Sequence, residues 1–244
     1  MTKDQLVAYS LKYDGESYEI EKALARQEPY EQLLDLPKVI CILDEAYPES
    51  LRKLSKPPYV LYYKGDLNLL KRDAVSIVGS RKPIVYAINQ TQRIVNLLAN
   101  EYVIVSGLAK GIDALAHSEA LKVNTTIAVL GCGIDYVYPS ENQALYRSIE
   151  ENGLILSEYP NLSLPLKHHF PHRNRIVAAL GKAVVVIQAD LKSGTMITVN
   201  EALNLGKEVY TIPYELSSIE GQGCNLLIQQ GANMILEDDD ILSI

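Results

Sequence analysis

The sequence predicts an α/β fold in which an open, doubly wound, mostly parallel sheet follows a short N-terminal helical region. Two observations carry this prediction. From residue 74 onward, short apolar runs alternate with segments whose apolar residues recur at helical spacing, which is the order of elements in such sheets. Several of the runs, for example residues 183–187, are continuously apolar and rich in β-branched residues, as strands covered on both faces are.

Residues 1–36 are predicted to form two or three short helices, because leucine, isoleucine and alanine recur there at helical spacing, with Pro29 and Pro37 as interruptions. We interpret this region as a helical cap on the core, with a small docking module as the alternative. Residues 37–244 are predicted to form the core. It begins with a strand at residues 39–43 and a tyrosine-rich extended stretch at 57–65, whose tyrosines we assign to packing, with base stacking as the alternative.

The repeating part of the core supplies the rest of the sheet. Its predicted strands are residues 74–78, 102–105, 126–130, 154–156, 183–187, 208–212 and 234–236. Its predicted helices are residues 86–100, 112–122, 142–151, 197–205 and 224–230. Because crossovers between parallel strands are right-handed, the carboxyl ends of these strands lie along one edge, where ligands of such sheets bind.

The composition limits the class of protein. No apolar run reaches the roughly 20 residues that cross a membrane, and the N-terminus does not begin a signal peptide. Three widely spaced cysteines without a CxxC motif predict neither disulfides nor a zinc site and fit a reducing cytoplasm. The net charge of −7 opposes long-range attraction of the whole molecule to nucleic acid, so binding of nucleic acid requires a local basic patch.

Glycines and basic residues gather where the predicted strands end. The turns are Gly79-Ser80-Arg81, then Gly107 to Gly111 with Lys110 between them, then Gly131-Cys132-Gly133, and finally Ser193-Gly194-Thr195. Glycine lets the backbone approach a ligand closely. Four such turns on one edge, with basic residues among them, predict a shared anionic ligand.

The segment Phe170-Pro171-His172-Arg173-Asn174-Arg175 adds two arginines ahead of the strand at 183–187. That strand leads to Ser193-Gly194-Thr195 at the mouth of a predicted helix. Unpaired N–H groups at a helix start suit an anion, and arginine forms bidentate hydrogen bonds with phosphate. We therefore predict a phosphate-handling face.

Several other sites are disfavoured. A GxGxxG motif does not follow the first strand of the repeat, and GxxxxGK[ST], HExxH and GxSxG are absent from the sequence. A metal site at His168, His169 and His172 is disfavoured, because carboxylates and cysteines are distant in sequence and adjacent histidines in an extended loop point in different directions. Asp113 and His117 are four residues apart and could form an acid–base pair, but we interpret them as structural.

Taken together, these motifs resemble the DprA/Smf (DNA processing protein A) family over roughly residues 38–236. The resemblance also includes Tyr47-Pro48, Ala116-His117, Tyr138-Pro139, Ser157-Glu158, Asn225-Leu226-Leu227-Ile228 and Gly231-Ala232. It implies an extended Rossmann-like core that binds single-stranded DNA without cutting it and needs no cofactor or metal. The implied DNA-binding residues are Gly79, Ser80, Arg81, Gly107, Lys110, Gly111, Arg173, Asn174 and Arg175.

The resemblance also implies a biological role and partners. Members of the family act in natural transformation and DNA recombination, protect incoming strands, help load the RecA recombinase and displace single-strand binding protein. They form homodimers through the C-terminal part of the core. Members often have a basic residue where this chain has Ser140 and glutamate where it has Gln188. The N-terminal region is shorter than a full SAM-like domain, and no winged-helix domain is expected after Ile244.

Two alternatives stay open at this point. Ser193-Gly194-Thr195 with Glu201 faintly resembles the signature of the LOG nucleotide phosphoribohydrolases, although the leading glycine pair is missing and the glutamate spacing is longer. The other alternative is an adaptor that chiefly holds RecA, with DNA binding secondary.

Overall fold

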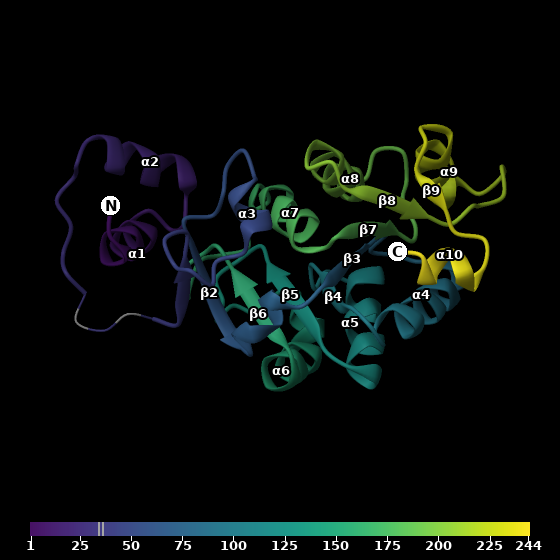
Figure 1. Cartoon of the computed structure of the whole chain (residues 1–244), viewed down its shortest axis with the longest axis horizontal. Helices are drawn as coiled ribbons and strands as arrows, with labels where there is room; N and C mark the ends of the chain where they lie inside the picture. The colour runs from purple at the N-terminus through teal and green to yellow at the C-terminus, as the bar shows by residue number, and fades with distance from the viewer. Residues whose placement is uncertain (34, 36) are drawn as a thin grey trace.

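The structure is a computed structural model that describes every residue except 34 and 36. Within this part of the chain, one nine-stranded sheet forms the centre of the molecule (Figure 1). Its strands are β1 (Val39–Cys41), β2 (Val60–Gly65), β3 (Ala74–Val78), β4 (Val103–Ser106), β5 (Thr126–Leu130), β6 (Leu154–Ser157), β7 (Ala183–Val186), β8 (Glu208–Thr211) and β9 (Asn233–Met234). The predicted α/β fold with a mostly parallel, doubly wound sheet is therefore confirmed.

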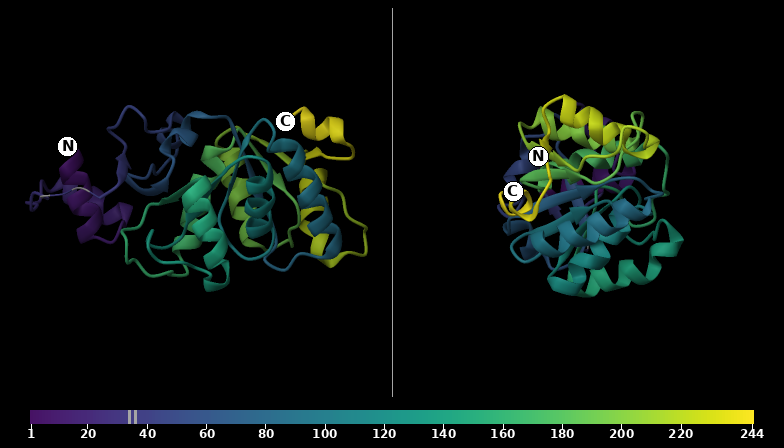
Figure 2. Two further views of the ribbon diagram at one scale, coloured as in Figure 1. Left: turned by 90° about the horizontal axis from the view of Figure 1, so that it is seen from below. Right: turned by 90° about the vertical axis from the view of Figure 1, so that its right-hand side faces the viewer.

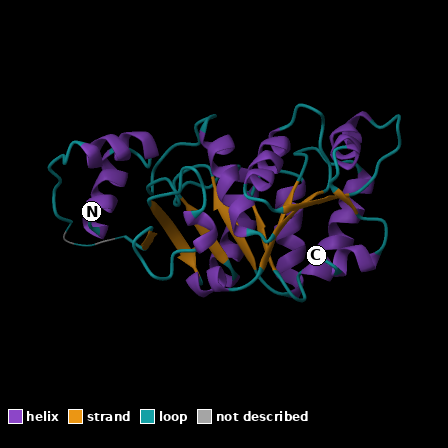
Figure 3. Cartoon of the chain, turned by 45° about the horizontal axis from the view of Figure 1, so that its top comes forward, coloured by secondary structure: helices purple, strands orange, loops and turns teal. Residues whose placement is uncertain are grey.

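The helices are placed around this sheet. They are α1 (Lys3–Lys12), α2 (Ser17–Ala25), α3 (Glu49–Arg52), α4 (Val85–Leu98), α5 (Ile112–Val123), α6 (Gln143–Asn152), α7 (His169–Leu180), α8 (Gly194–Asn204), α9 (Gln222–Gln229) and α10 (Asp238–Leu242). Figure 3 shows that they cover both faces of the strands.

The strand order creates a crevice in the middle of the sheet. The order is β1-β2-β6-β5-β4-β3-β7-β8-β9, and the pairs from β6 through β9 are parallel. From β3 the chain moves outward through β4, β5 and β6, and it then returns to place β7 on the other side of β3. Ligands of open α/β sheets bind at such a reversal, beyond the carboxyl ends of the strands. The loops that follow β3, β4 and β7 are therefore the expected location of a ligand site.

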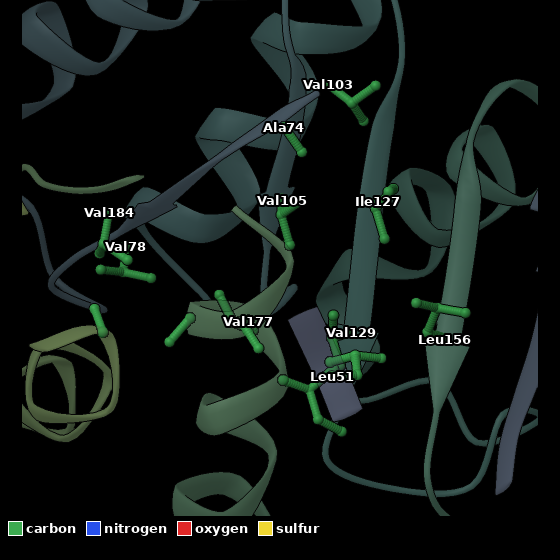
Figure 4. Close-up of a cluster of buried hydrophobic side chains, with 14 of the residues drawn as sticks. Leu51, Ala74, Val78, Val103, Val105, Ile127, Val129, Leu156, Val177 and Val184 are labelled. Carbon is green, nitrogen blue, oxygen red and sulfur yellow. The ribbon is translucent and has the colours of Figure 1, made fainter. Parts of the chain in front are cut away.

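The two faces of each central strand bury different clusters, as the two-residue period of a strand requires. Val184 and Val186 pack with α7 and α8, whereas Val185 and Ile187 pack with α4, α5 and α10. Figure 4 shows the first cluster, in which Val177 of α7 and Leu51 of α3 meet valines of the sheet. Because α7 is fixed by this core, the polar residues on its remaining faces have defined directions.

The N-terminal helices lie at the β1–β2 end of the sheet, and α9 and α10 lie at the other end (Figures 1 and 2). Leu6 and Val7 of α1 are fully buried against the β1–β2 hairpin. Tyr62 of β2 is also buried and donates a hydrogen bond to Ser10 Oγ at 3.0 Å, which confirms packing as the role of this tyrosine. The predicted third helix near residues 33–36 falls partly outside the described residues.

The segment at residues 169–180 departs from the sequence prediction. We expected an extended loop around the histidines, but it is helix α7, with His168 as the residue that caps its start. Pro171 lies in the first turn, where the missing N–H and the fixed φ of proline are tolerated. The expectation of an extended loop at the histidines is therefore wrong, and the chain begins a helix there.

Candidate functional site

A cavity of about 1100 Å³ opens at the predicted edge of the sheet. The loop after β3 and the loop after β4 form one part of its wall, and the loop after β7 with the start of α8 forms the opposite part. Helix α7 lines it between them. The cavity therefore occupies the crevice at which the strand order reverses.

One face of α7 lines the cavity. Phe170, Arg173, Asn174 and Val177 are spaced at i, i+3, i+4 and i+7, and all four contribute to the wall. Residues at this spacing share a helix face, whereas residues two apart do not. Because Arg175 is two residues after Arg173, its side chain leaves α7 in another direction.

Arg173 lies at the floor of the cavity and is only 4% exposed. Its guanidinium donates to the carbonyl oxygen of Gly107 at 2.6 Å and to that of Val129, at the carboxyl ends of β4 and β5. Its Nε donates to Asn174 Oδ1 at 3.1 Å. Arg173 thus joins α7 to the sheet and places a fixed positive charge beneath the cavity.

Arg81 and Lys110 bring two further positive charges to the same place. With Arg173, they line a smaller recess of about 60 Å³ beside the main cavity. The Arg81 guanidinium lies over the Phe170 ring, 5.8 Å from its centroid, as a cation–π pair. Lys110 forms an exposed ion pair with Glu141, a kind of contact that contributes at most about 1 kcal/mol and exchanges readily.

Arg175 does not reach the cavity. Its guanidinium is buried and forms an ion pair with Glu158, with Nη2–Oε1 and Nη2–Oε2 distances of 2.8 and 2.9 Å. It also donates to the carbonyl oxygens of Lys56 and His172, each at 2.9 Å. These contacts hold α7 to the segments before β2 and after β6. The structure gives Arg175 a packing role in place of an open basic surface.

The predicted glycines are explained mainly by contacts between turns. A Cβ on Gly107 would lie 2.4 Å from Arg173 Nη2, and one on Gly79 would lie 2.8 Å from Ile112 Cγ1. Gly111 has a φ of +79° and would place a Cβ 2.3 Å from the Ser80 carbonyl oxygen. We expected these glycines to admit a ligand. In the structure they let the turns and Arg173 pack against one another.

The start of α8 is open toward the cavity. Ser193 is the N-cap residue, but its side chain makes no capping hydrogen bond, and its Oγ is buried without a partner among the described residues. A Cβ on Gly194 would have open space around it. Asn174 Nδ2 donates to the Gly194 carbonyl oxygen at 3.2 Å and so ties α7 to this helix start. The first N–H groups of α8 are placed to donate hydrogen bonds to an anion.

The structure therefore gives the nine predicted binding residues four different positions. Six line the main cavity: Gly79, Ser80, Arg81, Gly107, Arg173 and Asn174. Lys110 lines the adjoining recess, and Gly111 supports the turn beneath them. Arg175 lies elsewhere.

Sequence reasoning missed several lining residues. Lys82 and Lys167 add basic groups to the cavity wall, although Asp113, Asp190 and Glu220 also line it. Lys82 directly follows the turn Gly79-Ser80-Arg81, and Lys167 directly precedes His168. Their closeness to these segments in the sequence could have identified them as lining residues. Gln188 also lines the cavity, where it accepts a hydrogen bond from the Ile84 N–H at 2.9 Å.

The structure also places the residues of the two catalytic alternatives, Glu201 and the pair Asp113 and His117. Glu201 lies one helical turn beyond Thr198, the last α8 residue that lines the cavity, so the resemblance to the phosphoribohydrolases gains no support. Asp113 is buried and accepts a hydrogen bond from the Gly107 N–H at 3.2 Å. Burial raises the pKa of Asp113, and the positive charge of Arg173 opposes that shift.

His117 is fully buried, and its hydrogen bonds define its protonation. Thr126 Oγ1 donates to the Ile104 carbonyl, so it accepts from His117 Nδ1 at 2.7 Å, which places the ring proton on Nδ1. Burial lowers the pKa of His117 to about 3. The ring is therefore neutral at pH 7 and serves as packing.

His117 should make the protein less stable in mild acid. The unfolded chain takes up a proton near the ordinary pKa of 6.5, whereas the folded chain does not until about pH 3. Ionisation of His117 therefore leaves the free energy of unfolding unchanged above pH 6.5. As the pH falls from 6.5 toward 3, it lowers the free energy of unfolding by about 1.4 kcal/mol per pH unit. Urea unfolding at pH 7.5 and 5.0 should show a loss about 2 kcal/mol greater in the wild type than in His117→Gln. Equal losses would contradict the buried, neutral assignment.

Comparison with known proteins decides the family. The model of the family described as DNA recombination-mediator protein A matches residues 38–244 of this chain. The chain belongs to the DprA/Smf family. The resemblance found in the strand-end motifs is thereby confirmed.

Members of the DprA/Smf family are similar in both sequence and structure. The DNA processing protein DprA of Streptococcus pneumoniae is 43% identical over 203 residues, which are 83% of this chain and 72% of the relative. Several other curated relatives are longer, and the chain spans about half of their length.

Two solved structures of DprA proteins match the fold. That of Streptococcus pneumoniae superposes with a TM-score of 0.83 at 36% identity and covers 99% of this chain and 93% of that one. That of Helicobacter pylori has a TM-score of 0.77 at 36% identity and covers 85% of this chain and 95% of its own. The Helicobacter pylori protein is described as having a unique single-stranded DNA binding mode.

In the described part of the chain, no helix combines the length and the apolar character that crossing a membrane would require.

Proposed function

We propose that the protein binds single-stranded DNA, without cutting it, at the cavity beyond the carboxyl ends of β3, β4 and β7. One observation carries the proposal. Arg81, Lys110 and Arg173 come from three separate segments and line one recess, which shares Arg81 and Arg173 with the cavity that the start of α8 lines. Membership in the DprA/Smf family and the description of the Helicobacter pylori relative support this ligand.

The basic residues would divide the phosphate contacts among them. Arg81 and Lys110 have side chains free enough to follow the backbone of the strand, with Lys110 leaving Glu141 for a phosphate. Arg173 would add a fixed charge from below, because its position is set by carbonyl groups. The N–H groups at the start of α8 would receive another phosphate oxygen.

Two aromatic rings at the mouth of the recess would stack on bases. Tyr138 and Phe170 both line it, and their ring centroids are 5.4 Å apart. Tyr138 is 43% exposed, so its ring is accessible. Base–aromatic stacking contributes roughly 1–3 kcal/mol per base and tolerates any sequence, which suits a protein that must accept arbitrary strands.

The biological role follows the family. In the cytoplasm, the protein would protect incoming single strands during natural transformation, displace single-strand binding protein and help load RecA for recombination. It would form a homodimer through the C-terminal part of the core. Exposed apolar residues there support an interface, since Met234, Leu236 and Leu242 are 40%, 62% and 55% exposed. An adaptor with secondary DNA binding would keep RecA loading when the basic recess is altered.

The salt dependence of binding tests the number of phosphate contacts. Fluorescence anisotropy with single- and double-stranded oligonucleotides should show preference for the single strand. Three charged contacts predict a slope of log affinity against log salt concentration of about −2 for a single strand. Tight binding with almost no salt dependence would contradict the proposed interface.

A further inference from the structure

Two histidines and a glutamate, which are far apart in the sequence, meet at the start of α7. Glu16 occupies the N-cap position of α2, His168 occupies that of α7, and His169 is the first residue of α7. Oε1 of Glu16 lies 3.1 Å from Nε2 of His168 and 3.3 Å from Nε2 of His169. A metal was disfavoured from the sequence because no carboxylate lies near these histidines along the chain, and the fold supplies one.

We propose that this triad binds a divalent transition metal ion, with Zn²⁺ favoured by its two imidazoles and one carboxylate. Zinc binds such atoms at about 2.0–2.2 Å, so neighbouring ligand atoms of a tetrahedral site lie roughly 3.3 Å apart. The two distances from Glu16 Oε1 are 3.1 and 3.3 Å, and all three ligand atoms lie within 4.8 Å of one another. Two histidines and a glutamate leave the fourth position for water.

The surrounding contacts hold the triad in place before an ion arrives. The His169 ring is 1% exposed and stacks on Tyr159, with ring centroids 3.8 Å apart and planes inclined by 18°. Ser163 Oγ donates to the Asp14 carboxylate at 2.8 Å, which holds the turn before α2 against the segment before α7. The His168 side chain is 65% exposed, so an ion can enter from solvent.

The affinity for zinc depends on the hydrogen bonds that the ligating side chains make with other residues. A histidine that ligates zinc usually donates its other ring nitrogen to an oxygen, and such contacts increase metal affinity about 10- to 100-fold. His169 Nδ1 has no such partner among the residues that the structure describes. We therefore expect micromolar affinity for zinc. Its effect would be to link α2 to α7, one turn ahead of Arg173.

Calorimetric titration of the untagged chain with ZnCl₂ tests the proposal. One Zn²⁺ should bind per chain, and Co²⁺ should give the absorption of a tetrahedral site. Glu16→Gln and His168→Gln alter exposed or half-exposed ligands, so they should fold normally, and each should weaken zinc binding at least about tenfold. The matched control Glu19→Gln changes another carboxylate of α2, which pairs with Lys22, and should bind zinc as the wild type does.

Thermal unfolding supplies a second readout. Zinc should raise the melting temperature of the wild type and of Glu19→Gln, but not that of Glu16→Gln or His168→Gln. Three results would overturn the proposal. The first is no saturable binding at zinc concentrations up to about 100 times the expected micromolar dissociation constant. The others are equal zinc affinity in the wild type and both ligand variants, or equal thermal shifts in the wild type and both ligand variants. In those cases the triad is held by hydrogen bonds alone.

Discussion

Replacing Arg81 by alanine is expected to weaken the binding of a single-stranded oligonucleotide by about 10- to 100-fold. A hydrogen bond to a charged group contributes about 1.5–3 kcal/mol, and Arg81 lines both the cavity and the recess. The salt slope should also become shallower by about 0.7, since one phosphate contact is lost. Anisotropy titrations over a range of salt concentrations measure both quantities.

Arg147→Ala is the matched control for this experiment. Arg147 is an exposed arginine of α6, outside the residues that line the cavity, so its loss changes the net charge equally. Its affinity for the single strand should stay within about twofold of the wild type. If Arg81→Ala and Arg147→Ala bind alike, the effect of Arg81 is one of total charge and the assigned site is wrong.

Arg173 is a less informative target, although it lies at the centre of the site. Its guanidinium satisfies the carbonyl oxygens of Gly107 and Val129. Removing it would delete both hydrogen bonds, at a cost of about 1–3 kcal/mol for each carbonyl oxygen left unsatisfied. A loss of DNA binding in Arg173→Ala would therefore combine the loss of a positive charge with a change in the local structure of the cavity. Arg81→Ala removes a charge without removing those buried hydrogen bonds.

Replacing Arg175 by methionine is expected to lower the free energy of unfolding by about 3–5 kcal/mol. The substitution leaves the carboxylate of Glu158, whose side chain is 3% exposed, buried without its cation. Single-stranded DNA affinity at a temperature where the variant is folded should change little, because Arg175 lies outside the cavity. Urea unfolding and anisotropy on the same preparation measure the two effects.

The double variant Arg175→Met with Glu158→Leu provides the internal control. Removing both members of a buried ion pair usually costs much less than removing one, so the double variant should be more stable than Arg175→Met alone. Ser17 Oγ also donates to Glu158 Oε1 at 3.0 Å, so recovery should be incomplete. A stable Arg175→Met that has lost DNA binding would show that Arg175 contacts phosphate after all.

The edge of the sheet and the position of the cavity on it could be predicted from sequence because they depend on local patterns. β3 at residues 74–78 and β5 at residues 126–130 coincide with the predicted runs, since continuous apolar segments between turns are distinctive. Once the strands are parallel, right-handed crossovers bring Arg81 and Lys110 to one edge. That these two residues lie close together therefore follows from the topology of the sheet and does not require knowledge of how side chains pack.

The differing roles of Arg173 and Arg175 could not be predicted in the same way. Both belong to one basic segment, and their separation depends on that segment being helical. The segment was expected to be an extended loop, whereas the packing of Val177 against the sheet favours a helix. Tertiary burial prevailed over the local signals.

The roles of the glycines and of the histidine cluster also could not be predicted from local sequence. Gly107 was expected to admit a ligand, but the clash that a Cβ would make is with Arg173, 66 residues later in the chain. Glu16 meets His168 across 152 residues of sequence, and neither segment carries a metal-binding motif. Contacts of this separation are set by the tertiary fold, which brings Glu16 to the start of α7, and they leave no local pattern.

The most direct test of the proposed interface is ultraviolet cross-linking of the wild-type chain to a single-stranded oligothymidine, followed by mass spectrometry of the attached peptides. Cross-links should fall on Phe170 and Tyr138 and on peptides that contain Arg81 or Lys110, because these line the recess. Cross-links confined to α6, to the N-terminal helices α1 and α2, or to the β9–α10 end would contradict the account.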